Sequence, residues 1–575
     1  MTRRIASFAA LLVLASTSAF LPGPAYAQES GSSHRLPLVE DWSTRHWIYP
    51  GAASEFSSPE QATDPRLLHA WLVGNPSWTQ ARREALEKAE NLGELGALAH
   101  RRHRRRTDWA FPLGTNGGMP VGETPAKYSF DVHQLPSCTN DFAVFVINAS
   151  PGVGSQANII ALNNLYSGPG TSYCSMLNPT TMWSYAAGQG PITTSPVLSS
   201  DGTKVAFVDN YLRGRLNVLT WQAGQGTDAT TGAVAPGTGG SSLTVLDFTN
   251  IGGNPNCPVS NSTAGNASPY VDYRNDIAYV ATDNGRLYKI TGIFAGTPTV
   301  AYCITVNSNK SLTSPVYDAV SGNVFISDGQ KLYAFLPGAT SFTSAGTPVL
   351  IASLTAHSIV LSPIVDAPNH WVYAFSGTDS TGTFSAAAQV KTDLSSSTIA
   401  FMGDATTTNY ILDGEFDNSY YTIGPLPGAR MYACGTQVGS GGTRPSLYAF
   451  NFSNAGVLNT AATMSDNRKI TTPATNGTCS PLLELYDGTN DRLFVGVSGS
   501  DQVTMWDITA PITAASNPTA TATGLTGGTS GFAIDNFSAL PQASSIYFGT
   551  LAATGTPPCG SPNYCAVKLT QSALQ

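Results

Sequence analysis

The 575-residue sequence predicts an all-β protein folded as a β-propeller, and we favour eight four-stranded blades over seven. Three observations predict this fold. A Ser-Pro element recurs along the chain, each copy is followed by the same order of strands and turns, and a short segment before the first copy resembles an outer strand. The prediction includes closure by this N-terminal strand and a small helical N-terminal extension.

The composition favours a folded β-rich chain. Apolar residues make up 42% of the sequence and aromatic residues 10%, whereas only 11% are charged. Disordered chains combine low hydrophobicity with high net charge, so this composition argues against disorder. Many short apolar runs between clusters of Gly, Pro, Asn and Ser are typical of an all-β protein.

The Ser-Pro element recurs at intervals that suit propeller blades. Successive copies lie between 46 and 73 residues apart, which fits repeats of 40–50 residues with insertions. We expect a first copy at Tyr128-Ser129-Phe130 and degenerate copies at Gly424-Pro425-Leu426 and Gly531-Phe532-Ala533. The five clear copies are Ser195-Pro196, Ser268-Pro269, Ser314-Pro315, Ser362-Pro363 and Ser480-Pro481.

Each copy is followed by the same interior. After a turn comes a β-rich run such as Ile277–Val280, then a second turn and a third run such as Leu287–Ile290, and then a looser fourth run such as Val300–Cys303. Four strands in this order form one blade. A single blade cannot bury both of its faces, whereas blades stacked in a closed ring bury them and remove the exposed edges.

The last blade lacks one strand in the sequence. The copy that begins at Gly531 offers three strands, the last of which ends near Leu569. Residues 108–114 lie before the first copy and resemble an outer strand. We therefore predict that this N-terminal strand completes the last blade and closes the ring.

The repeats resemble those of a known superfamily. The order Ser-Pro-x-x-Asp, a Val/Tyr run and Gly-x-Leu-Tyr-Ala-Phe is similar to the quinoprotein (pyrroloquinoline-quinone-type) alcohol-dehydrogenase-like β-propellers, over residues 108–575. The resemblance implies the fold. A quinoprotein enzyme would be expected to carry a catalytic Asp, Glu and Asn calcium ligands, and often two adjacent cysteines. No adjacent cysteines exist, and no residues match those ligands, so pyrroloquinoline quinone is not supported by the residues.

The first residues resemble a secretory signal peptide. Arg3 and Arg4 precede an apolar stretch, and Ala25-Tyr26-Ala27 is a small-x-small cleavage motif, so residues 1–27 are predicted to direct Sec-type export. We expect a secreted or periplasmic protein, with no membrane span in the mature chain. The formal charge of −8 argues against nucleic-acid binding, which requires Lys and Arg side chains that neutralise phosphates.

Residues 28–107 form the predicted N-terminal extension. Asp64-Pro65 is a helix-start signal for a short helix through Trp71, and residues 81–90 favour a second helix. The run Arg101–Arg106 could bind an anionic surface or be a protease site, but we favour a solvated linker. Four tryptophans in the extension indicate that it packs against the propeller or a partner chain; they are Trp42, Trp47, Trp71 and Trp78.

The chain contains eight cysteines, an even number that suits disulfides in an oxidising compartment. The close spacing of Cys559 and Cys565 predicts one bond. The next guesses are Cys138–Cys174 and Cys257–Cys303, and Cys434–Cys479 follows by elimination. Eight cysteines allow 105 connectivities, so the sequence alone does not decide among them.

Two sets of acidic residues are candidates for a site. Asp413, Glu415 and Asp417 alternate along the chain and could ligate calcium or act in acid–base chemistry, although a polar loop is the simpler interpretation. A second set follows the Ser-Pro elements, and we expect its members to accept backbone hydrogen bonds in the next turn rather than bind a cation. This set contains Asp272, Asp318, Asp366, Glu484 and Asp535.

No catalytic residue emerges from the sequence, and we lean toward a role without catalysis. The leading hypothesis is an exported binding or scaffold module for a protein or a glycan. The alternative is an enzyme with a metal or quinone cofactor in the central channel, either a divergent quinoprotein dehydrogenase or a carbohydrate-active lyase or hydrolase. Polar side chains converging on the channel mouth would favour the enzyme, and an apolar patch on one face would favour the binding module.

Overall fold

The computed structural model describes residues 35–48, 64–73 and 108–570, apart from gaps at 170–171, 212, 249–256, 258–263, 354–358, 462–475, 514–515, 536–541, 554–557 and 561. Residues 36–575 form one unit, and the ring described below belongs to it. The predicted signal peptide 1–27, the predicted helix at 81–90 and the arginine run 101–106 lie outside the described residues.

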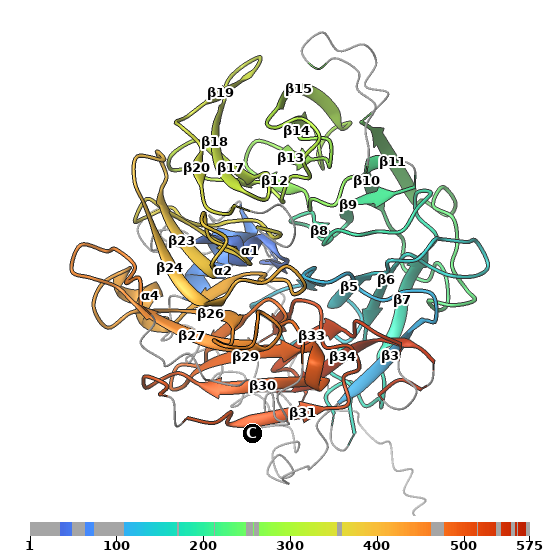
Figure 1. Cartoon of the computed structure of the whole chain (residues 1–575). Helices are drawn as coiled ribbons and strands as arrows, with labels where there is room; N and C mark the ends of the chain where they lie inside the picture. The colour runs from blue at the N-terminus through green and yellow to red at the C-terminus, as the bar shows by residue number, and fades with distance from the viewer. Residues whose placement is uncertain are drawn as a thin grey trace, which may run out of the picture. The chain divides into compact units, whose positions relative to one another are not determined.

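Eight small antiparallel sheets surround a central channel, which confirms eight blades rather than seven (Figure 1). We label the strands of each blade A to D, from the channel outward. The strands are short and rich in Val, Ile, Tyr and Phe, residues that suit a pleated surface buried on both faces.

The first four blades follow one another along the chain, and the last of them has a D position divided between two short strands that both pair with β18. Their strands are, for blade 1, β4 (Ala126–Ser129), β5 (Phe142–Val146), β6 (Ile159–Asn163) and β7 (Thr180–Tyr185); for blade 2, β8 (Val197–Leu198), β9 (Lys204–Asn210), β10 (Gly214–Thr220) and β11 (Ser242–Asp247); for blade 3, β12 (Tyr270–Asp272), β13 (Ile277–Ala281), β14 (Arg286–Thr291) and β15 (Thr299–Thr305); and for blade 4, β16 (Val316–Tyr317), β17 (Val324–Ser327), β18 (Lys331–Pro337), β19 (Phe342–Ser344) and β20 (Val349–Leu350).

The second half of the ring repeats the arrangement, with three strands among the described residues of blade 6. The strands are, for blade 5, β21 (Ile364–Asp366), β22 (Trp371–Ser376), β23 (Phe384–Lys391) and β24 (Ser397–Asp404); for blade 6, β25 (Gly414–Phe416), β26 (Arg430–Thr436) and β27 (Pro445–Asn451); for blade 7, β28 (Leu483–Tyr486), β29 (Asp491–Val497), β30 (Gln502–Asp507) and β31 (Ala520–Thr523); and for blade 8, β32 (Ala533–Asp535), β33 (Ser545–Gly549) and β34 (Tyr564–Thr570). A 3₁₀ turn, η3 (Ser498–Ser500), joins β29 to β30.

The outer strand of blade 8 comes from the N-terminal side of the propeller. Strand β3 (Trp109–Gly114) pairs antiparallel with β34, and Trp109 lies opposite Lys568. The Trp109 side chain is buried, packs 5.9 Å from the Tyr547 ring and donates a hydrogen bond to the Leu165 carbonyl. The predicted closure of the ring is therefore confirmed.

Four of the clear Ser-Pro copies lie directly before an A strand, and Ser480-Pro481 is separated from β28 only by Leu482. The degenerate copy at Gly424-Pro425-Leu426 was assigned wrongly. The A strand of blade 6 is β25 (Gly414–Phe416), and residues 424–426 follow a short helix, α4 (Asn418–Ile423), that lies between β25 and β26. Asp417 caps this helix by accepting the Tyr420 N–H, and this capping signal was missed in the sequence.

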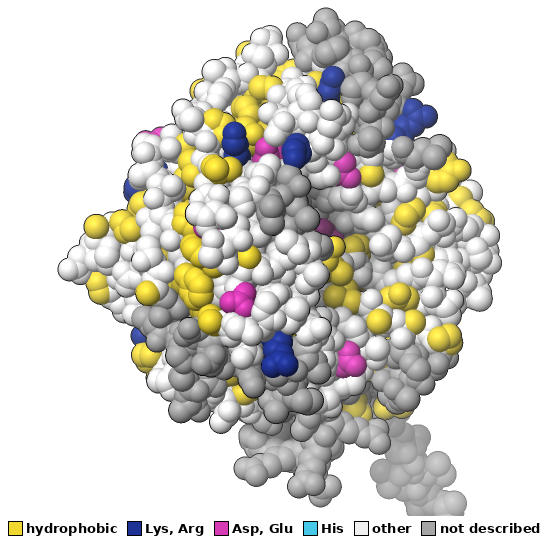
Figure 2. Space-filling model, viewed as in Figure 1, with side chains coloured by type: hydrophobic (Ala, Val, Ile, Leu, Met, Phe, Trp, Pro, Cys, Tyr) yellow, Lys and Arg dark blue, Asp and Glu magenta, His cyan; other side chains and the backbone are white. Residues whose placement is uncertain are grey.

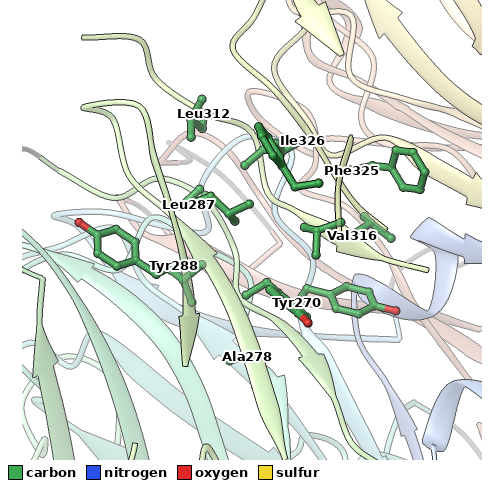
Figure 3. Close-up of a cluster of buried hydrophobic side chains, with 14 of the residues drawn as sticks. Tyr270, Ala278, Leu287, Tyr288, Leu312, Val316, Phe325 and Ile326 are labelled. Carbon is green, nitrogen blue, oxygen red and sulfur yellow. The ribbon is translucent and has the colours of Figure 1, made fainter. Parts of the chain in front are cut away.

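The hydrophobic core lies between neighbouring blades. At the junction of blades 3 and 4, Leu287 of one blade lies near Ile326 of the next (Figure 3). On the other face of blade 3, Tyr288 stacks on Phe248 with ring centroids 4.7 Å apart, and all four side chains are buried. Each blade thus covers the face that its neighbour would otherwise expose, which is why one blade alone would not be stable.

All four expected disulfides are present. Cys559–Cys565 closes a loop in blade 8, and Cys138–Cys174 joins the A–B and C–D loops of blade 1. Cys257–Cys303 reaches from the segment before blade 3 to strand β15. Cys434–Cys479 links β26 of blade 6 to the segment that leads into blade 7.

One long insertion has more structure than its composition suggests. A Gly/Thr/Ala-rich stretch such as residues 222–242 is typical of a flexible surface loop, but this one packs back against blade 1. Ala229 accepts a hydrogen bond from the Ala157 N–H, Val234 donates to the Ser184 carbonyl, and both Ala229 and Ala233 are fully buried. Small side chains allow this close approach, so the Gly/Ala-rich composition reflects packing rather than mobility.

Strand direction defines two faces of the ring. Because neighbouring strands are antiparallel, the A–B and C–D loops lie on one face, which we call the A–B face. The B–C loops and the connections between blades lie on the other, the B–C face. In the part of the chain that is described, no helix combines the length and apolar character needed to cross a bilayer.

Candidate functional site in the central channel

The described part of the N-terminal extension lies inside the ring. Strand β1 (Leu38–Glu40) pairs antiparallel with β4 of blade 1, and strand β2 (Trp47–Ile48) pairs parallel with β21 of blade 5. The helix α1 (Ser43–His46) connects the two strands. In a ring of eight blades, blades 1 and 5 lie opposite each other. The segment that pairs with both therefore crosses the channel, as Figure 1 shows for α1 and α2. We call residues 36–48 and 64–73 the channel segment.

The tip of the channel segment is held by polar contacts to several blades. Arg45 donates hydrogen bonds to the Leu482 carbonyl before blade 7 and to Thr124 Oγ1 before blade 1. His46 Nδ1 lies 2.7 Å from Ser362 Oγ and 3.2 Å from the Pro363 carbonyl, at the start of blade 5. Burial lowers the pKa of His46 to about 3, so this contact is made by a neutral imidazole.

Each of the two strands of the channel segment makes one further side-chain hydrogen bond to a blade. Trp47 Nε1 donates to Asp318 Oδ1 of blade 4 at 3.3 Å. Glu40 Oε1 accepts the Ile534 N–H of blade 8 at 2.7 Å. The segment thus contacts blades on all sides of the channel through side chains as well as backbone pairing.

The predicted helix after Asp64 is confirmed as α2 (Pro65–Val73). Asp64 accepts the Arg66 backbone N–H and also binds its guanidinium, through Nε at 2.9 Å and Nη2 at 2.6 Å. Arg66 Nη2 also donates to the Val271 carbonyl of blade 3, and the guanidinium lies 4.2 Å from the centre of the Tyr270 ring. A buried arginine is thereby both paired and stacked against an aromatic face.

The repeated serines form a belt of hydrogen bonds between neighbouring blades. Ser195 Oγ accepts the Thr124 N–H, Ser268 Oγ accepts the Ser195 N–H, and Ser314 Oγ accepts the Ser268 N–H. Glu123 accepts from both Ser195 Oγ and Ser268 Oγ. The serines of blades 2 to 4 therefore have a physical role, because each of these three hydroxyls satisfies a buried backbone donor of the preceding blade.

The three alternating carboxylates have separate partners. Asp413 accepts the Leu482 N–H, and Glu415 accepts the Tyr421 hydroxyl at 2.6 Å. Asp417 caps α4 and pairs with Arg430 at 3.2 Å. Burial raises the pKa of Asp413 to about 7, against the opposing charge of Arg45. The candidate residues are therefore buried structural acceptors in this arrangement.

The recurrent acids divide into two groups. Asp272, Asp318 and Asp366 each accept backbone N–H groups in the turn that follows, as expected. Asp535 pairs instead with Lys127. Glu484 lies beside Asp491, and burial together with that neighbouring carboxyl group raises the pKa of Glu484 well above its usual value.

Metal binding by the candidate acids stays a prediction. Within the described ranges, no group of three or more His, Cys, Asp or Glu side chains is arranged to hold a metal ion. The contacts of Asp413, Glu415 and Asp417 lead to different elements, and calcium would have to compete with the hydrogen bonds described above.

Sequence reasoning missed the residues that fill the channel. Glu40, Arg45, His46 and Arg66 were not singled out, although all lie in the tryptophan-rich extension. A usable signal was available: charged residues stand next to tryptophans in the stretch Asp41–Trp47, Asp-Trp-Ser-Thr-Arg-His-Trp. Charged groups beside large aromatic residues are typical of polar anchors within a buried interface.

Comparisons with known proteins add little to this description. No protein-family model and no curated protein sequence matches the chain. Among solved structures, BamB from Moraxella catarrhalis is similar at 13% identity and a TM-score of 0.36, over 74% of this chain and 92% of that one. Saccharomyces cerevisiae Sqt1 is similar at 9% identity and a TM-score of 0.45, over 81% of this chain and 99% of that one. Both scores are below 0.5, so neither likeness carries an argument, and the ring rests on its own strand pairing.

Proposed function

We propose that this protein is an exported binding module that recognises a protein or a glycan on one face of its ring. The observation that carries the proposal is the channel segment. A cofactor or substrate in the channel would need the space and the polar groups that residues 36–48 and 64–73 already use. Recognition is therefore expected on the outer faces, where loops present side chains to solvent.

The A–B face is the better candidate for binding. Among the residues that the structure describes, fourteen large hydrophobic side chains are exposed. Seven of these belong to A–B or C–D loops, whereas four lie on the B–C face and three within strands. Figure 2 shows charged side chains scattered singly over the viewed surface, with hydrophobic side chains between them. The seven are Leu135, Met176, Leu177, Val320, Tyr421, Ile423 and Leu426.

Export is supported by the covalent structure. All eight cysteines are paired in four disulfides, which form and persist in oxidising compartments. The signal-like residues 1–27 and the motif Ala25-Tyr26-Ala27 support the same proposal. Edman sequencing of the exported protein tests it, and a mature N-terminus near Gln28 is expected.

The binding proposal is tested with two matched double variants of the full chain. Ile423→Ser/Leu426→Ser removes apolar side chains from the A–B face, and Val153→Ser/Tyr211→Ser does the same on the B–C face. Each protein is screened on an immobilised glycan array and, with a photo-crosslinking residue at Thr422, against exported proteins of the host. We expect affinity to fall about tenfold or more in the first variant and to stay unchanged in the second.

Two outcomes contradict this proposal. One is purified protein that contains stoichiometric calcium and shows a quinone absorbance, which would support the enzyme alternative. The other is the absence of any ligand in both screens.

A further inference from the structure

The seam between blades 8 and 1 contains a buried lysine–aspartate contact. Lys127 lies on β4, the A strand of blade 1, and Asp535 lies on β32, the A strand of blade 8. Lys127 Nζ is 2.7 Å from Asp535 Oδ2, and the two side chains are only 3% and 5% exposed. Two chain segments about 400 residues apart in sequence thus meet through a nitrogen nucleophile and a carboxyl carbon in a site without bulk water.

A third group stands beside this pair. Glu40 of the channel segment lies directly opposite Lys127 in the β1–β4 pairing, so the two side chains are neighbours on one face. Glu40 Oε1 accepts the N–H of Ile534, the residue before Asp535, while Oε2 is buried and has no hydrogen-bond partner among the described residues. Burial raises the pKa of Glu40 to about 8, so the group is protonated at neutral pH.

Aromatic side chains surround this position. Lys127 Nζ lies 5.9 Å from the centre of the buried Tyr166 ring, and burial together with Asp535 raises the pKa of Tyr547. Asp141, the other acid near Lys127, is already engaged by the Tyr166 hydroxyl and the Phe130 and Ser137 N–H groups.

We propose that Lys127 and Asp535 join in an intramolecular isopeptide bond, with Glu40 as the proton relay. Lys127 Nζ attacks Asp535 Cγ, so that a C–N bond forms and one C–O bond breaks. Nζ gives up two protons, and the departing oxygen accepts them through the Glu40 carboxyl group and leaves as water. No oxidant, reductant or other reactant is needed, and contact between the reacting groups replaces an encounter in solution.

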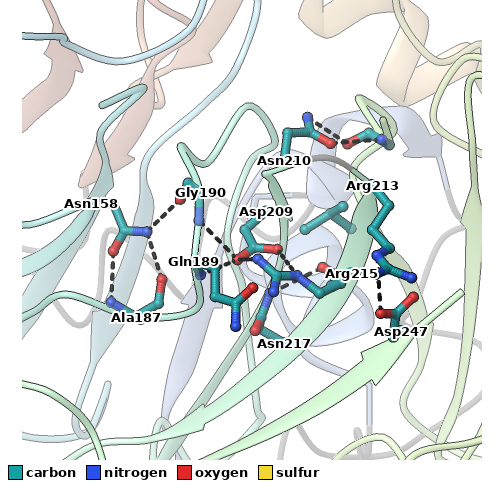
Figure 4. A network of polar contacts seen from close by, with 12 residues as sticks. Asn158, Ala187, Gln189, Gly190, Asp209, Asn210, Arg213, Arg215, Asn217 and Asp247 are labelled. Carbon is teal, nitrogen blue, oxygen red and sulfur yellow. Dashed lines mark hydrogen bonds and ion pairs between the residues drawn. The ribbon is translucent and has the colours of Figure 1, made fainter. Parts of the chain in front are cut away.

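Lys127 and Asp535 differ chemically from the buried ion pairs that contain arginine. Asp209 binds the Arg215 guanidinium through both carboxylate oxygens, at 2.8 and 2.7 Å (Figure 4). Asp64 and Asp417 also pair with arginines. A delocalised guanidinium stays protonated and does not form this amide, so these pairs remain ionic.

Mass spectrometry of the reduced, denatured full chain tests the proposal. We expect wild-type protein to be lighter than its sequence by one water molecule, and a tryptic digest to contain a branched peptide that joins the Lys127 and Asp535 regions. Lys127→Arg and Asp535→Ala should show the full mass. Glu40→Gln should give a mixture in which much of the chain is unreacted, and Asp209→Ala, the matched control, should keep the mass deficit.

A gel gives a second readout. Because the bond closes a loop of several hundred residues, the reduced wild-type chain should migrate faster in denaturing electrophoresis than Lys127→Arg. Wild-type protein of full mass, with separate Lys127 and Asp535 peptides, would overturn the proposal and leave an ion pair only. That result decides the matter even where a variant fails to fold.

Discussion

The latch strand and the channel segment both come from the N-terminal part of the chain, yet they join the ring in different ways. The latch, β3, pairs with one neighbour, β34, along its length, with a single register shift between Pro112 and Gly114. The channel segment pairs over only a few residues with β4 and β21 and relies on side chains that reach blades 3, 4, 7 and 8. The latch is a strand of a repeat, whereas the channel segment is a set of individual polar contacts. The comparison teaches that regular strand pairing can be predicted from a repeated sequence pattern, whereas individual side-chain contacts between distant segments cannot.

The largest loss of stability is expected from a variant that weakens the latch strand, β3. Trp109→Ala removes a fully buried indole between blades 8 and 1 and leaves the Leu165 carbonyl without its donor. We expect a loss of about 4 kcal/mol in the free energy of unfolding, measured by urea denaturation. Phe111→Ala in the same strand, at a half-buried position, should cost clearly less. Equal losses would show that the strand, and not the buried indole, sets the stability of the closure.

The second test breaks the channel segment. Arg66→Ala leaves the buried Asp64 carboxylate uncompensated and removes the contacts to Val271 and Tyr270, so we expect a loss of about 3 kcal/mol. Arg213→Ala is the control, because its pair with Asp247 is half-exposed and should contribute about 0.5 kcal/mol. A loss at Arg66 no larger than the control would mean that the segment adds nothing to the ring.

The third test uses pH to examine the surroundings of Arg45. An Asp413 pKa of about 7 in the folded protein exceeds its usual value, so the unfolded chain ionises first. The contribution of Asp413 to stability is therefore greatest in acid and declines as pH rises from about 4 to 7. Asp413→Asn should flatten this decline in unfolding curves recorded between these values. Other buried acids, such as Glu415 and Glu484, shift in the same direction, so some slope should remain. If the decline of stability with pH were unchanged in Asp413→Asn, groups other than Asp413 would be responsible for it.

The smallest test compares two buried tryptophans of the channel segment. Trp47→Phe removes the hydrogen bond to Asp318 and should cost about 1 kcal/mol beyond the change in packing. Trp42→Phe is the matched control, since Trp42 is equally buried but its Nε1 has no hydrogen-bond partner among the described residues. Thermal unfolding of the two variants should therefore differ, with Trp47→Phe the less stable. Equal unfolding temperatures for the two variants would show that the hydrogen bond from Trp47 to Asp318 does not stabilise the protein measurably.

Much of the fold could be predicted because it repeats. The strands at Ile277–Val280 and Leu287–Ile290 and the latch follow from local patterns and their spacing. The four disulfide pairs are confirmed, but only the close spacing of Cys559 and Cys565 predicted one of them from a local pattern. The error at Gly424-Pro425-Leu426 has a physical reason. The A strand of blade 6 lacks the Ser-Pro element, and helix α4 displaces the next Gly-Pro pair into a loop.

The channel could not be predicted in the same way. Nothing local to Arg45 or Glu40 indicates Leu482 or Ile534 as a partner, because those contacts depend on the closed ring. The tryptophans of the extension showed that it packs against something, but periodicity cannot specify a surface made by eight separate blades. The acids 413, 415 and 417 were recognisable as a cluster, whereas their partners depend on helix α4 and on blade 7.

The hydrogen bond between Glu40 and Ile534 bridges 494 positions of the chain, and the one between Asp108 and Thr570 bridges 462. During synthesis the first partner of each pair emerges long before the second. The channel segment and the latch strand therefore lack these contacts until the C-terminal blade has been synthesised. Contacts of such long range slow folding, so late truncations should be far more harmful than their small size suggests.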